Sequence, residues 1–151
     1  MDKVKKPAKH GVHFWLNCVT VCLVVLAAVA YYIGAEVFGY YDDLSITILL
    51  LMAASAIGAV ACAILPDKFG DKIYFSLGGL VIGVLLVVCV MMIADARVYS
   101  IAVLLFSELE RDNVEGYNAL YSSLAAMGLL LGGVICNVVS NFCGAKHIEA
   151  K

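Results

Sequence analysis

The stretch that decides the fold is ADARVYSIAVLLFSELERDNVEGYNALYSSLAAMGLLLGGVICNVVSN, residues 94–141. It joins a third long apolar run to a fourth, and it holds most of the polar residues that lie next to apolar sequence. The rest of the chain is chiefly apolar sequence that would pack around this segment. How the segment is placed therefore decides how many times the chain crosses a membrane.

The composition indicates a membrane protein. Of the 151 residues, 64% are hydrophobic and 15% are charged, which is far more apolar than the usual mix of a soluble domain. Because a single soluble domain of this length could not cover so much apolar surface, a lipid bilayer is the expected partner. The formal net charge is -2 and the basic residues form no continuous stripe, so we expect no nucleic-acid binding.

Four apolar runs have the length of membrane spans. The first, residues 14–34, has 21 residues without a charge, and at about 1.5 Å per residue it reaches about 30 Å, the thickness of a bilayer core. The other three runs are 46–65, 73–94 and 117–142. We therefore expect one all-α integral membrane domain covering residues 1–151, with four transmembrane helices.

Residues 96–106, between the third and fourth runs, are ambiguous. They are apolar apart from Arg97 and Ser100, but 11 residues cover only about 16 Å as a helix, which is too short to cross a bilayer core. We expect a short interfacial or re-entrant helix here on the outer side, followed by an acidic linker at 108–115. The alternative, a further crossing by residues 96–107, stays open at this point.

The distribution of Lys and Arg predicts the orientation. Four basic residues lie in the N-terminal head, two in the turn 67–72 and two in the C-terminal tail, against Arg97 and Arg111 on the other side. Because basic loops are retained in the cytoplasm, we expect both termini to be cytoplasmic. A cleaved signal peptide is a rival interpretation of the first span, but its 21-residue run exceeds the usual 7–15-residue apolar core.

The opposite, outer side carries eight carboxylates, which keep the loops solvated or attract cations. These carboxylates are Glu36, Asp42, Asp43, Asp95, Glu108, Glu110, Asp112 and Glu115.

The outer polar segment next to the membrane is the candidate polar site, with Asp95, Arg97, Glu115 and Asn118 as its members. Asp95 lies at the outer edge of the third span and Arg97 follows two residues later. A solvated surface pair is one interpretation, and a partly buried pair is the other. An ion-coupled carrier usually needs an ionisable group near the middle of the membrane, and the predicted spans contain none.

No pattern typical of an enzyme or a metal site is present. All six cysteines lie in, or at the end of, predicted spans, where free cysteine packs as a small hydrophobic residue. His10, His13 and His147 lie in the basic termini without a carboxylate or thiol partner in the sequence. The common hydrolase, metalloprotease and phosphate-binding motifs are missing. We therefore expect no enzymatic activity, no cofactor and no bound metal.

Small residues on the fourth span predict how the helices associate. In lipid, small side chains let helix backbones approach closely and gain dispersion contacts. The predicted docking face consists of Ala125, Gly128, Gly132 and Gly133. Its partner is either a helix of the same bundle or a helix of another membrane protein.

The run AILPDKFGDK, residues 63–72, resembles the cytoplasmic turn of the major facilitator superfamily, Gly-x-Leu-x-Asp-Arg/Lys-x-Gly-Arg/Lys-Arg/Lys. The residues that match are Asp67, Lys68, Gly70 and Lys72. Ala63 replaces the leading glycine of that pattern, and Asp71 replaces a basic residue.

The second half of the chain is similar to one branch of that superfamily, the potassium-channel regulators first named for uncoordinated worms. The similar residues are Ala94, Asp95, Ala96, Leu105, Phe106, Glu115, Tyr117, Asn118, Tyr121, Ser123 and Gly128. A full facilitator would cross the membrane between Asp95 and Glu108, and about half of its twelve spans would be missing here.

Two functions remain open. The resemblance implies a non-catalytic accessory or regulatory protein, which associates through its helices with a channel or transporter. The alternative is a half-sized facilitator-type solute carrier, which must form a homo-oligomer to enclose a path.

The charge distribution yields a test of topology. We expect reporters fused at both termini and inserted at Lys68 to face the cytoplasm, and reporters at Asp43 and Glu110 to face the opposite side, because basic segments stay cytoplasmic. Protease protection or glycosylation tags in intact cells measure this. A C-terminal reporter on the outer side would show a further crossing.

Overall fold

A computed structural model describes residues 11–38, 44–69, 73–107 and 112–145, and these residues are almost entirely helical, with no strand among them. The elements in chain order are α1 (Val12–Tyr32), the π-helical turn η1 (Ile33–Val37), α2 (Ile46–Phe69), α3 (Ile73–Phe106) and α4 (Val114–Ala145). The all-α expectation is thus confirmed for the described residues.

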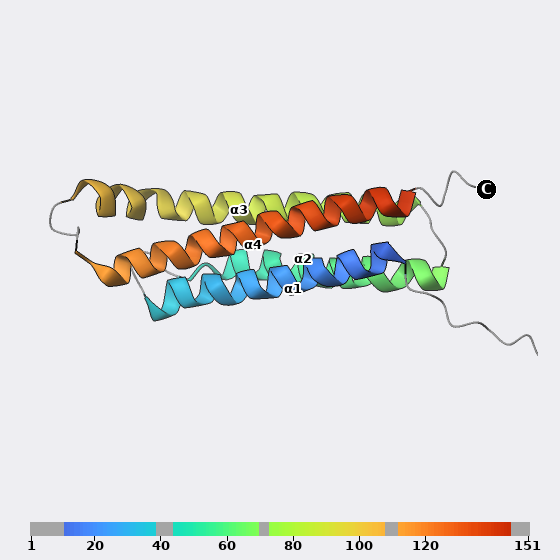
Figure 1. Cartoon of the computed structure of the whole chain (residues 1–151), viewed down its shortest axis with the longest axis horizontal. Helices are drawn as coiled ribbons and strands as arrows, with labels where there is room; N and C mark the ends of the chain where they lie inside the picture. The colour runs from blue at the N-terminus through green and yellow to red at the C-terminus, as the bar shows by residue number, and fades with distance from the viewer. Residues whose placement is uncertain (1–10, 39–43, 70–72, 108–111, 146–151) are drawn as a thin grey trace, which may run out of the picture.

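The four helices lie side by side in one bundle (Figure 1). Helix α1 packs on α2 and α4, and α3 also packs on α2 and α4, so the order around the bundle follows the chain. All four are long and apolar enough to cross a membrane, through residues 12–37, 46–65, 77–106 and 114–143. The second of these ranges has the bounds expected from the sequence, and the helix continues for four residues beyond it.

The separate outer helix expected at 96–106 is not shown, because these residues continue α3 without a break to Phe106. No Gly or Pro interrupts the helix near Asp95 or Arg97, and the buried side of the segment finds partners on α4. Leu104 and Ala119, for example, are buried together in a small second cluster. The polar residues at 95 and 97 therefore mark no helix end.

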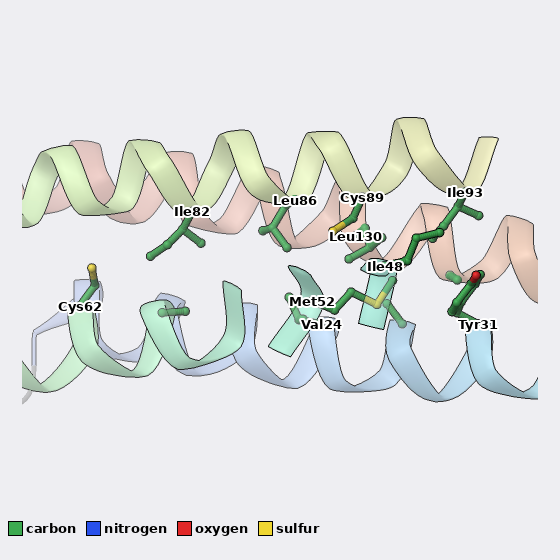
Figure 2. Close-up of a cluster of buried hydrophobic side chains, with 13 residues drawn as sticks. Val24, Tyr31, Ile48, Met52, Cys62, Ile82, Leu86, Cys89, Ile93 and Leu130 are labelled. Atoms are coloured by element: carbon green, nitrogen blue, oxygen red, sulfur yellow. The ribbon is translucent and has the colours of Figure 1, made fainter. Parts of the chain in front are cut away.

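The core consists of side chains that all four helices direct inward (Figure 2). Val24, Met52, Leu86 and Leu130, one from each helix, are at most 2% exposed. By contrast, outward-facing residues such as Ile57 are mostly exposed although they are apolar. A lipid bilayer is the solvent that suits such an outer surface.

The two helical hairpins differ in length. At the end of the bundle that carries the α3–α4 connection, α3 and α4 extend beyond the ends of α1 and α2 (Figure 1). There the backbone N–H of Ser45 donates to the Tyr31 hydroxyl at 3.1 Å, which ties the start of α2 to the end of α1. Phe38 covers the neighbouring part of α4 by packing on the second cluster.

Candidate functional site

The guanidinium of Arg97 is the most deeply buried charged group in the described chain, with the residue only 1% exposed. Its position on α3 lies inside the apolar range 77–106. Asp95 is exposed and makes no described ion pair with it. The interpretation of Arg97 as part of a solvated surface pair is therefore wrong. The side chain points into the bundle, where polar atoms of α4 and η1 accept its hydrogen bonds.

Arg97 joins three elements by hydrogen bonds. Its Nε donates to Ser123 Oγ on α4 at 2.8 Å, and its Nη2 donates to the carbonyl oxygen of Gly34 at 3.3 Å. Ser123 Oγ in turn donates to the Ala119 carbonyl oxygen at 3.0 Å. In a low-dielectric surrounding, such bonds to a charged group are strong and expensive to lose.

The π-helical turn supplies one acceptor for this cluster, the carbonyl oxygen of Gly34. In the last turn of α1, the Ala30 carbonyl oxygen accepts from Ser122 Oγ at 2.5 Å. A Cβ on Gly34 would lie 3.2 Å from the Ser122 Cβ, so glycine is what lets α4 approach here.

A second polar cluster lies at the opposite end of the bundle, around His13 of α1. Its Nδ1 lies 2.8 Å from Ser140 Oγ and 3.0 Å from the Ser140 carbonyl oxygen. Its Nε2 lies 3.2 Å from the Cys62 carbonyl oxygen and 3.1 Å from Asn17 Nδ2. One imidazole ring thereby bridges α1, α2 and α4.

Sequence reasoning misses both clusters, because their partners are far apart along the chain. His13 meets residues 49 and 127 positions away, and Arg97 meets residues 26 and 63 positions away. A partial signal exists on α1, where the buried residues Asn17 and Thr20 follow His13 at helical spacing. That spacing predicts an inward polar face but not its partners.

The predicted docking face divides into two parts. Ala125 and Gly128 are exposed, and a Cβ on Gly128 would meet nothing within 4 Å. Gly132 and Gly133 instead face neighbouring helices. A Cβ on Gly132 would lie 3.6 Å from Leu23 Cδ1 of α1, and one on Gly133 would lie 3.8 Å from Leu86 Cδ1 of α3. Only the first part is thus available to another protein.

The remaining predicted site residues are not brought together. Glu115 and Asn118 are exposed on the first turns of α4, away from the Arg97 contacts. Asp67 and Lys68 lie in the last turn of α2, whose side chains are not described there. Gly70 and Lys72 of the facilitator-like turn lie outside the described residues. Within the described parts of the chain, no cluster of His, Cys, Asp and Glu could hold a metal ion.

Comparison with models of known protein families, with curated proteins and with solved structures finds no match for this chain. The resemblance to the facilitator superfamily therefore stays a prediction.

The Arg97 cluster yields a test by mutation. Ser123→Ala removes the acceptor of the Arg97 Nε and should lower the stability by about 1–3 kcal/mol, since a buried donor then lacks its partner. Asp95→Asn, an exposed change two residues from Arg97, should stay within about 0.5 kcal/mol. Thermal melts of the purified variants in one detergent compare them. Equal melting temperatures for Ser123→Ala and the parent would contradict the role given to this bond.

Proposed function

We propose that this chain is a non-catalytic accessory or regulatory membrane protein that associates with another membrane protein through the exposed part of α4. The observation that carries this proposal is the bare surface at Ala125 and Gly128. Both residues are exposed, and no other part of the bundle approaches the space beside Gly128. The channel or transporter class of partner comes from the family resemblance alone.

Other glycines of the spans serve contacts inside the bundle. A Cβ on Gly58 would lie 3.1 Å from Ile82, one on Gly78 3.2 Å from Cys62, and one on Gly83 3.2 Å from Asn137. Glycine inside a helix is about 1 kcal/mol less favourable than alanine, so each such position needs a compensating contact. Gly128 has no such contact within 4 Å in the described chain, and a helix from another protein would supply it.

The filled interior supports a role without solute transport. Three hollows between helices are bordered by exposed side chains: one of about 610 Å³ between α3 and α4, and two of about 370 and 280 Å³ between α1 and α2. The centre is instead occupied by the core side chains (Figure 2).

A half-sized carrier that dimerises is the second candidate, and Arg97 favours it. An ionisable residue within a transmembrane segment is often part of a substrate or ion path. Arg97 is such a residue, but its described contacts hold it to α4 and η1 on the inside of one chain. Under this alternative, the partner at Gly128 would be a second copy.

The exposed surface of α4 yields the test of the proposal. Gly128→Leu should fold and melt like the parent, because its side chain enters open space, and should lose about five- to tenfold of the co-purified partner through steric exclusion. Cross-linking followed by a mild-detergent pull-down and mass spectrometry measures this loss and identifies the partner.

Ala54→Leu is the matched control, since Ala54 is also exposed but lies on α2. It should retain the partner. Recovery of the same partner in equal amount with Gly128→Leu would remove this surface from the proposal. A partner that consists only of further copies of the chain would favour the carrier.

A further inference from the structure

Two carboxamide side chains lie at one end of the groove between α3 and α4. Its volume is about 610 Å³, within the range of small-ligand sites, about 300–1,000 Å³. It is lined at the polar end by Gly79, Asn137 and Asn141, and along its length by apolar residues that include Val84 and Val134.

Two carboxamide groups meet at Gly79 without full hydrogen bonding. Asn137 is 1% exposed, and its Nδ2 donates to the Gly79 carbonyl oxygen at 2.7 Å. Its Oδ1 is buried and has no hydrogen-bond partner among the described residues. The bond to a carbonyl acceptor fixes which amide atom is the nitrogen. The Asn141 side chain also packs against Gly79, whose missing Cβ makes room for it, and it makes no hydrogen bond within the described chain.

An unpaired amide group beside a lipid-facing groove is unfavourable, because neither the packed helices nor the hydrocarbon region offers it a hydrogen-bond partner. A ligand that brings a hydroxyl group would supply that partner. Its hydrogen would pair with the Asn137 Oδ1, and its oxygen would accept from the Asn141 amide.

The polar and apolar ends of the groove are arranged like the head group and the apolar body of a lipid in one leaflet. Gly79 lies six residues after the start of α3, and Asn141 lies four residues before the end of α4. The polar end of the groove therefore lies toward one end of the bundle, the level expected for a membrane boundary. Val88 and Val134, at the other end of the groove, lie deeper, where apolar surface is required.

No charged side chain lines the groove in the described chain, so an uncharged head group fits better than a phosphate. The geometry points to a binding site for an uncharged membrane lipid of the sterol class, with its hydroxyl at Asn137 and Asn141 and its ring system along the valines. A sterol combines one hydroxyl with one compact apolar body, which matches one polar end and one apolar groove. This site is separate from the exposed surface at Gly128.

The test uses the full chain in lipid nanodiscs and a photoreactive cholesterol analogue. Asn141→Leu should weaken labelling about tenfold, the effect of losing one hydrogen bond in a dry site. Val84→Trp should weaken it similarly by filling the groove, since Val84 is exposed at its edge. Val81→Trp is the matched control: Val81 is equally exposed on the same helix but does not line the groove, so its labelling should equal that of the parent.

Competition separates the hydroxyl from the ring system. Unlabelled cholesterol should displace the probe, and the corresponding 3-ketone should do so less well, because it has no hydrogen to give to Asn137. Cross-linked peptides should map to α3 and α4 beside the groove. Equal labelling of Asn141→Leu, Val84→Trp and the parent would overturn the proposal, as would displacement by diacylglycerol but not by cholesterol. Melting temperatures close to that of the parent show that the variants are folded.

Discussion

Burial of the Arg97 guanidinium is the interaction on which one end of the bundle depends. A cation can remain inside an apolar bundle only when acceptors from its neighbours surround it. Ser123 provides one acceptor from α4, and Gly34 provides another from the π-helical turn. The irregular turn at the end of α1 is thus part of the same arrangement, since its Gly34 carbonyl oxygen accepts from Arg97 of α3.

The opposite end follows the same rule with an imidazole ring at its centre. His13 bonds to atoms of α2 and α4, and Asn137 bonds to the backbone of α3. Between the two polar ends lies an apolar core to which every helix contributes, with Leu86 and Leu130 among its residues. Polar contacts therefore set the alignment of the helices at both ends, while close packing fills the middle.

The fold was largely accessible from the sequence, because long apolar runs have few alternatives to membrane-spanning helices. The bounds of the second span and the existence of all four agree with hydropathy alone. The sequence did not reveal that residues 96–106 continue α3. A polar pair such as Asp95 and Arg97 gives the same sequence pattern whether it marks a membrane boundary or lies inside a continuous helix. Arg97 and His13 owe their environments to residues far away in the chain, which no local pattern encodes. Among the small residues, the sequence could not distinguish Gly128 from Gly133, because both belong to the same helical pattern. Only the packing of the helices shows that Gly128 is exposed and Gly133 is buried.

The unequal lengths of the two hairpins give the protein two hydrophobic thicknesses. The apolar part of α2 has 20 residues and spans about 30 Å, whereas that of α3 has 30 residues and spans about 45 Å. An ordinary bilayer covers the α2 range, whereas it covers the whole α3 range, in which Asp95 is exposed, only by thickening or if α3 tilts. Lipid deformation is thereby concentrated on the α3 side of the molecule. It is relieved when this side lies in a thicker membrane or beside another membrane protein with long helices. The bundle consequently has a preferred side for lateral contact that is set by bilayer mechanics and needs no sequence motif.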